Sequence, residues 1–338
     1  MKIKMGQKAI ILINLGTPDT PEVKSVRRYL FQFLNDSRVI DLPLLLRKFL
    51  VNFIIVPFRA KKSSKLYKLL WTENGSPLLF YTKRVWQKLQ KLLGNDYKVL
   101  YAMRYGNPSL KTLLKEIESE NFSDIIFVPL YPQYSSSTTG SVYELILKEI
   151  GKWHIIPNLK FVNQFYNNKV FIKAFKNEII KNDINKYEHI IFSFHGLPLN
   201  QIQNSHPNHL IVQCDCKASV PLHGNYCYKA TCYETARLMA EVLNLSENQF
   251  SISFQSRLSE NWLSPFTDKL LIEKAKSGIK NILIVAPSFV SDCLETIVEI
   301  EIEYRNLFIE NGGNNLTLVK GLNDSDEWVE ALKEIIMS

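Results

Sequence analysis

The sequence predicts an α/β fold with two doubly wound parallel sheets, and three observations support this class. Short apolar runs alternate along the chain with longer amphipathic segments, which is the pattern of right-handed βαβ units. A chain of 338 residues is too long for one small core. The apolar runs fall in similar number on each side of residue 165, so two similar halves are expected.

The expected strands are short apolar runs, each nearly continuous, as in parallel strands that are covered on both faces. In chain order they are residues 9–15, 98–103, 124–130, 159–163, 189–194, 250–255, 281–286 and 316–319.

Helical patterns lie between these runs, at residues 21–34, 80–93, 109–120, 141–150, 169–180, 228–243, 267–276, 292–309 and 326–336. We expect one domain over residues 1–165 and a second over 166–322. A C-terminal helix within 323–338 is expected to pack back on the first half. Neither GxGxxG nor GxxxxGK[ST] occurs, so no nucleotide cofactor is expected.

The composition is that of an ordinary globular protein, with 46% hydrophobic and 22% charged residues. The formal net charge of +8 favours an anionic partner, such as an acidic membrane face or a substrate with carboxylates. No arginine-rich tract occurs, so we expect no nucleic-acid partner. The N-terminus has no secretory signal pattern, and the cysteine usage indicates a reducing compartment, so a cytoplasmic location is expected.

The most apolar stretch, residues 42–58, is interrupted by Arg47 and Lys48. It is too short and too charged to span a bilayer. We expect an apolar lip in the first domain, which leaves open peripheral contact with the inner membrane face. The alternative is a pair of ordinary buried helical turns.

In folds of this class, ligands bind beyond the carboxyl ends of the strands. His195 follows an apolar run directly, and its imidazole suits both ferrous iron and proton transfer near neutral pH. It could instead simply cap the strand end. Residues 131–141 form a hydroxyl-rich loop that leads into a helix, either as an anion site or as a plain N-cap loop.

An acidic row follows the seventh apolar run. Asp292, Glu295 and Glu299 are spaced to share one helix face, with Glu303 one turn further on. Like charges at this spacing disfavour a helix slightly, so the row suggests cation attraction or proton relay. The alternative, a capping box of Asp292 and Glu295, leaves Glu299 and Glu303 unexplained.

Four of the five cysteines, Cys214, Cys216, Cys227 and Cys232, lie within one short segment. They could ligate a [2Fe–2S] cluster or a structural zinc ion, with His223 as a substitute ligand, or bind no metal.

Several of these segments occur in an order and spacing that resemble the ferrochelatase family over almost the whole chain. They are LINLGTPDTP, GSPL at 75–78, MRYGNPS at 103–109, YPQYSSSTTGS, SFHGLP, QSR…W at 255–262 and FVSDCLET. The resemblance implies two Rossmann-like, chelatase-like domains around a porphyrin cleft. It also implies a lyase that inserts Fe²⁺ into protoporphyrin IX to form protohaem with release of two protons, the terminal step of haem biosynthesis.

The resemblance also implies roles for individual residues. His195 resembles the catalytic histidine and Glu295 its acidic partner, both as ligands of the Fe²⁺ substrate, with Asp292, Glu299 and Glu303 as an acidic strip. The residues that resemble porphyrin contacts are Leu15, Arg59, Tyr67, Ser76, Arg104, Tyr131 and Trp262.

Three departures from the family pattern matter. Cys293 stands where many members have histidine, and Ser136 replaces a cluster cysteine of the animal enzymes, whose C-terminal extension has no counterpart here. The 214–232 segment instead resembles the internal cysteine insertion of bacterial members with a [2Fe–2S] cluster. Two rivals stay open: a chelatase for cobalt or coproporphyrin, and a non-catalytic haem or iron–sulfur protein.

Overall fold

A computed structural model describes residues 7–206, 210–211 and 215–338. The described chain forms two compact units, each made of more than one stretch. The first unit holds the residues up to Tyr131 together with 136–163 and 332–338, and the second holds 132–135 and 164–331.

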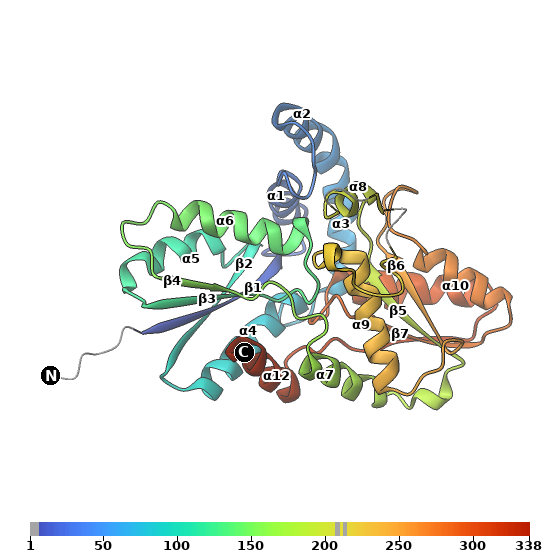
Figure 1. Cartoon of the computed structure of the whole chain (residues 1–338). Coiled ribbons are helices and arrows are strands. Elements are labelled where there is room, and N and C mark those ends of the chain that lie inside the picture. Colours follow the sequence, from blue (N-terminus) through green and yellow to red (C-terminus); the bar gives the residue numbers. More distant parts are fainter. Residues whose placement is uncertain (1–6, 207–209, 212–214) are drawn as a thin grey trace. The chain divides into compact units, whose positions relative to one another are not determined.

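The first unit is built on a parallel sheet with strand order β2-β1-β3-β4. Its strands are β1 (Lys8–Thr17), β2 (Tyr97–Gly106), β3 (Asp124–Pro129) and β4 (Asn158–Phe161). Helices α5 (Leu110–Ile117) and α6 (Ser141–Ile150) cover one face, and α4 (Pro77–Leu93) lies on the other (Figure 1). The central strands β1 and β3 are therefore buried on both faces, which explains why their sequences are nearly continuously apolar, whereas the edge strand β4 is partly exposed.

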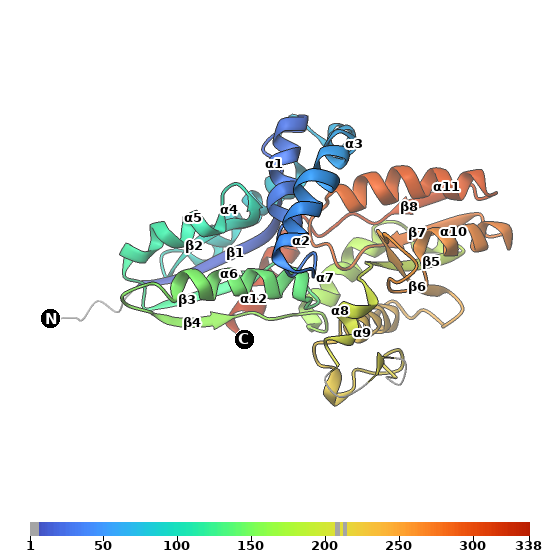
Figure 2. The ribbon, with the colours of Figure 1, turned by 90° about the horizontal axis from the view of Figure 1, so that it is seen from above.

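The second unit repeats the same strand order as β6-β5-β7-β8, again all parallel. Its strands are β5 (His189–His195), β6 (Phe250–Gln255), β7 (Asn281–Val285) and β8 (Asn315–Leu318). Helices α10 (Thr267–Lys276) and α11 (Arg305–Glu310) cover one face, and α9 (Tyr228–Val242) lies on the other with α7 (Lys169–Ile180) (Figure 2). The predicted fold class and all predicted strands are confirmed.

After α1 (Val23–Leu34), the first unit continues as one helical stretch composed of α2 (Leu44–Phe49), η1 (Leu50–Ile55) and α3 (Val56–Leu70). Leu45, Phe53 and Phe58 on this stretch are 82%, 71% and 79% exposed. The alternative of ordinary buried turns is therefore wrong for these side chains. Within the described ranges, no helix is both long and apolar enough to cross a membrane.

In the described part of the chain, three helical segments have π geometry, in which each N–H bonds the carbonyl five residues back. They are η1, η3 (Ser136–Gly140) and η7 (Leu294–Tyr304). π-Helical turns are rare and are frequently found at functional sites. All three fall in segments that the sequence analysis singled out: the apolar lip, the hydroxyl-rich loop and the acidic row.

The other short elements among the described residues are α8 (Leu199–Gln203) and the 3₁₀ turns η2 (Glu118–Glu120), η4 (Ile184–Lys186) and η6 (Leu222–Gly224). Helix α12 (Asp326–Met337) closes the chain, and its residues from Leu332 onward group with the first unit. There Lys160 Nζ donates a hydrogen bond of 3.2 Å to the carbonyl of Ile336.

Candidate functional site

His195 is the last residue of β5 and lies opposite Gln255 of β6, at the carboxyl end of the second sheet. Its half-buried ring has the rings of Trp262 and Phe289 as neighbours, with centroids 6.4 and 6.2 Å away. Its Nδ1 lies 2.6 Å from the carbonyl oxygen of Gly196. A carbonyl oxygen can only accept, so Nδ1 carries a proton, and it is Nε2 that presents a lone pair whenever the ring is deprotonated.

Gly196 has no room for a side chain. A Cβ at this position would lie 2.8 Å from the carbonyl oxygen of Gln255 and 3.4 Å from the ring of Trp262. The Gly196 N–H also donates to that Gln255 oxygen at 2.8 Å. The turn after His195 is therefore packed tightly against the neighbouring strand.

The helix that carries Glu295 and Glu299 is η7 (Leu294–Tyr304). A capping box of Asp292 and Glu295 would need Asp292 as the N-cap, but the N-cap lies one residue later. Cys293 is its N-cap and forms the capping box with Thr296, since the Cys293 N–H donates to Thr296 Oγ1 at 3.0 Å. The alternative box of Asp292 and Glu295 is therefore wrong.

The expectation that Asp292 shares a helix face with Glu295 and Glu299 is also wrong, because Asp292 lies outside the helix. Its buried carboxylate accepts hydrogen bonds from Gly321 N at 3.1 Å, Asn323 Nδ2 at 2.7 Å and Thr296 Oγ1 at 3.1 Å. These bonds hold the carboxylate against the loop that follows β8. Asp292 thus braces the start of the helix.

Glu295 and Glu299 are both half-buried, one turn apart on η7, whereas Glu303 is exposed. The side chain of Glu295 accepts a hydrogen bond from the Cys293 thiol, and its carbonyl oxygen accepts one from Gln255 Nε2 at 3.0 Å. The acidic row therefore runs from the packed interior of the unit out to solvent.

The carboxylate of Glu299 is surrounded by donors. The backbone N–H of Ser256 lies 2.7 Å away, and the Ser256 hydroxyl and Gln255 Nε2 bond the second oxygen. Tyr304 Oη donates at 2.8 Å. Tyr304 is five residues from Glu299, and such residues become neighbours only because the helix is π rather than α.

Burial raises the pKa of Glu299, although hydrogen bonds from Ser256 and Tyr304 and the positive charge of His195 oppose the rise. The negative charge of Glu295 raises this pKa further. His195, Glu295 and Glu299 therefore interact electrostatically within the second unit. A carboxyl group whose pKa is raised by burial is suited to accepting and releasing protons near neutral pH.

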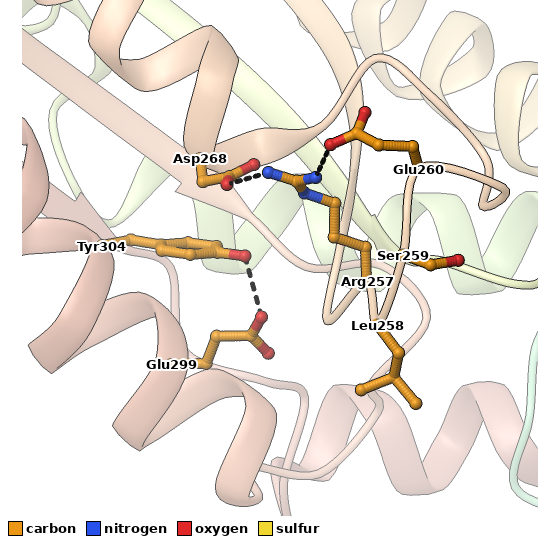
Figure 3. A pocket seen from close by; sticks show the side chains of 7 residues that line it. All are labelled: Arg257, Leu258, Ser259, Glu260, Asp268, Glu299 and Tyr304. Atoms are coloured by element: carbon orange, nitrogen blue, oxygen red, sulfur yellow. Dashed lines mark hydrogen bonds and ion pairs between the residues drawn. The ribbon is translucent and has the colours of Figure 1, made fainter.

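A pocket of about 430 Å³ opens beside Glu299 in the same unit. Figure 3 shows Tyr304 and Glu299 pointing toward each other, while Arg257 reaches Asp268 at 2.8 Å and also contacts Glu260. The backbone of Ser256 has a φ of +63°, a strained conformation for a residue other than glycine. The two bonds from Ser256 to Glu299 offset this strain.

In the first unit, Arg104 forms an ion pair of 2.5 Å with Asp36, and both side chains are largely buried. The same Asp36 oxygen accepts from Tyr105 Oη at 2.8 Å and Ser141 Oγ at 2.6 Å. Burial opposes the charge on Asp36, but the hydrogen bonds and Arg104 outweigh it, so the pKa of Asp36 is lowered. Arg104 is therefore held rigidly at the start of α6.

The other predicted porphyrin contacts differ in exposure. Tyr67 and Ser76 are buried, and Ser76 accepts a hydrogen bond of 2.9 Å from Thr17. Leu15 is half-buried and Arg59 is exposed. The hydroxyl of Tyr131 is buried and has no hydrogen-bond partner among the described residues, which is unusual for a phenol in a protein interior.

Three of the four clustered cysteines, Cys216, Cys227 and Cys232, are buried in the second unit, while Cys214 lies outside the described residues. Cys227 is the N-cap of α9 and accepts from Ala230 N at 3.4 Å. Among the residues described, no group of three or more histidine, cysteine or acidic side chains is arranged to hold a metal ion. The donor set of a cluster is therefore not assembled from the described residues alone.

Sequence reasoning missed the residues that hold the candidate groups in place: Asp36, Tyr228, Ser256 and Tyr304. Ser256 lies within the QSR segment at residues 255–257, so the sequence marks its position but does not indicate that it bonds Glu299. Tyr304 could not have been found, because the predicted helix was α rather than π.

The fold is that of solved chelatases. SirB from Bacillus subtilis, solved with Fe³⁺, matches with a TM-score of 0.56 at 12% identity, covering 98% of this chain and 96% of that one. The sirohydrochlorin chelatase SirB from Bacillus subtilis subspecies spizizenii, solved with cobalt, gives a TM-score of 0.55 at 11% identity, covering 98% and 94%. At these identities the likeness defines the fold class, a chelatase-like pair of α/β units.

The sequence then identifies the family. The ferrochelatase family model matches residues 7–338. The ferrochelatase of Legionella pneumophila (strain Lens) is 40% identical over 333 residues, covering 98% of both chains. That of Coxiella burnetii (strain Dugway 5J108-111) is 40% identical over 342 residues, covering 99% of this chain and 95% of that one. This chain belongs to the ferrochelatase family, whose members are enzymes that insert a metal ion into a porphyrin.

Proposed function

We propose that this chain inserts Fe²⁺ into protoporphyrin IX, forming protohaem and releasing two protons. The observation that supports this most directly, in a member of the ferrochelatase family, is that His195, Glu295 and Glu299 gather around Gln255. Gln255 pairs with His195 across the sheet, and its Nε2 donates to the Glu295 carbonyl and to the Glu299 carboxylate. One imidazole and two half-buried carboxylates supply the bases that metal insertion requires.

The chemistry of insertion explains why these groups suit it. A free porphyrin has two pyrrole N–H protons, and both must leave as the metal exchanges its water for the four ring nitrogens. In our proposal, His195 accepts a pyrrole proton through Nε2 or ligates the iron substrate, and Glu295 serves as proton acceptor or iron ligand. Glu299 relays protons outward toward the exposed Glu303, while Asp292 holds the helix start.

We further propose that the predicted porphyrin contacts serve as such. The orphaned hydroxyl of Tyr131 supports a polar contact with a ligand. Leu15 and Trp262 supply apolar surface, and Arg104 is rigidly placed by Asp36. Arg59 at the exposed surface is suited to attracting propionates, while Tyr67 and Ser76 are buried.

The proposed function is tested by an anaerobic insertion assay that pairs Fe²⁺ and Co²⁺ with protoporphyrin IX and with coproporphyrin. We expect the highest kcat/KM for Fe²⁺ with protoporphyrin IX, because the exposed apolar lip favours a substrate with two carboxylates over one with four. Faster turnover of cobalt or of coproporphyrin would favour the rival chelatase. A coloured protein without turnover would favour a non-catalytic haem or iron–sulfur protein.

The absorbance spectrum of the same anaerobic preparation tests our proposal that the cysteine segment holds a [2Fe–2S] cluster. Burial of Cys216, Cys227 and Cys232 is consistent with ligation of a cluster. Against ligation, these thiols do not form a metal-binding group among the described residues. A sulfur-to-iron charge-transfer spectrum with about two irons per chain is expected for a cluster. Zinc found by metal analysis would assign a structural zinc site instead. If neither a cluster spectrum nor zinc is found, the cysteines bind no metal.

We propose, finally, that the enzyme works in the cytoplasm and that its lip contacts the inner membrane face. Arg47 is buried, and its guanidinium donates to the carbonyls of Asn35 at 3.0 Å and Leu42 at 2.7 Å. This leaves the apolar side chains outermost. Exposed cations on the same helical stretch include Lys48, Arg59, Lys61, Lys62 and Lys65. This combination suits an anionic lipid surface.

Replacing Leu45, Phe53 and Phe58 together with serine is expected to weaken binding to vesicles containing phosphatidylglycerol at least tenfold. Each apolar side chain contributes about 1.5–3 kcal/mol when it leaves water. Vesicle flotation measures the effect. The matched control is Ile155→Ser, which removes an apolar side chain that is 72% exposed outside the lip. Equal binding of all variants would contradict a role for the lip.

A further inference from the structure

We propose that Tyr228 is a positioning residue for His195, an inference that rests on the proposed function and names a further residue of that site. Tyr228 is the first residue of α9 and is buried. Its hydroxyl donates a hydrogen bond of 2.8 Å to the backbone carbonyl of His195.

This bond restrains the peptide that directly follows His195. The His195–Gly196 peptide is bonded on one side by the carbonyl oxygen of Gln255, which accepts from Gly196 N at 2.8 Å. Tyr228 holds the opposite side. Because glycine has no Cβ, its backbone rotates more freely than that of other residues. These two hydrogen bonds, one to each polar group of the peptide, help to fix its plane.

The plane of the peptide in turn affects the imidazole. The next carbonyl along the chain, that of Gly196, accepts from His195 Nδ1 at 2.6 Å. If the peptide turned, this carbonyl would move, and the ring that bonds it would move as well. Tyr228 therefore influences where Nε2 points, although it does not touch the ring.

The phenol is itself held in place. Its oxygen lies 3.2 Å from Ser288 Oγ, in the segment after β7, and it also interacts with Cys232 one turn along α9. Burial raises the pKa of Tyr228, so the hydroxyl keeps its proton and stays a donor. A buried hydroxyl needs such partners, since leaving one unbonded costs about 1–3 kcal/mol.

The same residue connects the cysteine segment to the site. Tyr228 directly follows Cys227, and its side chain forms a hydrogen bond with Cys232. The Tyr228 hydroxyl therefore connects the start of α9, where these thiols lie, to the backbone of His195. A shift of the cysteine segment would therefore move Tyr228 and, with it, the backbone of His195.

The test compares Tyr228→Phe with Tyr233→Phe, a half-buried tyrosine on the same helix that has no contact with His195 among the described bonds. We expect Tyr228→Phe to lower kcat for iron insertion by about tenfold to 10²-fold, as for a misplaced reacting group. The KM for protoporphyrin should change less than twofold. Tyr233→Phe should keep the kcat of the native enzyme.

A second readout separates this inference from the proposed function. The nitrogen NMR shifts of labelled His195 should report a mixture of ring tautomers in Tyr228→Phe and a single Nδ1–H tautomer in the native enzyme. If the native enzyme inserts no iron, the proposed function fails, and these shifts still test the role of Tyr228.

Unchanged kcat and unchanged shifts in Tyr228→Phe would overturn the inference. So would equal losses of kcat and of melting temperature in both variants, which would make the tyrosine merely structural. If Tyr228→Phe does not fold, Ser288→Ala loosens the phenol without removing it. That variant should lower kcat about threefold with KM unchanged, and a kcat equal to native would overturn the inference.

Discussion

Replacing His195 with alanine is expected to lower kcat for iron insertion by about 10²–10⁴-fold, the usual contribution of a general acid–base group. The substitution removes Nε2, the nitrogen that the Nδ1 bond to Gly196 leaves with its lone pair. Porphyrin binding should persist, because the apolar surface near His195 comes from Trp262 and Phe289. Fluorescence titration with protoporphyrin measures the binding, and a single-turnover assay measures the insertion.

His195→Asn is the informative companion variant. Its amide can still donate near the position of Nδ1 but places no nitrogen at the position of Nε2. Equal losses in both variants would assign the function to Nε2, whereas near-native turnover in either one would remove His195 from the chemistry.

Replacing Glu295 with glutamine is expected to lower kcat by about 10²-fold or more. Glutamine keeps the size of the side chain but can neither hold a negative charge for Fe²⁺ nor accept a proton. Since Cys293 and Thr296 form the capping box, the helix start should survive the change. Circular dichroism checks the fold, and steady-state kinetics measure the rate.

Glu301→Gln is the matched control, because the same change is made on the same helix at an exposed carboxylate outside the acidic row. We expect it to change kcat less than about threefold, which corresponds to under 1 kcal/mol. A loss of kcat at Glu301 as large as that at Glu295 would indicate that the helix acts through its total negative charge and not through Glu295 itself.

The central strands could be predicted from the sequence because they are buried on both faces, and burial on both faces leaves a nearly continuous apolar run. His189–His195 and Asn281–Val285 are examples, and both were found to within one residue of their ends. His195 could be singled out for the same reason, since a polar residue directly after such a run lies at the carboxyl end of the sheet.

The acidic row could be predicted only in part. Asp292 was expected on the helix face because α-helical spacing was assumed, but bonds from Asn323 and Gly321 hold it elsewhere. These partners lie about thirty residues away in the sequence, and no local pattern reports them. The ion pair of Asp36 with Arg104 was missed for the same reason, since the two residues are 68 positions apart.

The π geometry of residues 294–304 has a consequence for length variation in this protein. A helix of this kind holds one residue more per hydrogen-bonded ring than an α-helix does. Removing one residue between Glu299 and Tyr304 could therefore restore α geometry without disturbing the fold. The phenol that now bonds the Glu299 carboxylate would then be four residues away, with a different approach to it. A shortened homologue could thus keep its architecture and its acids while changing how readily the middle acid gives up its proton.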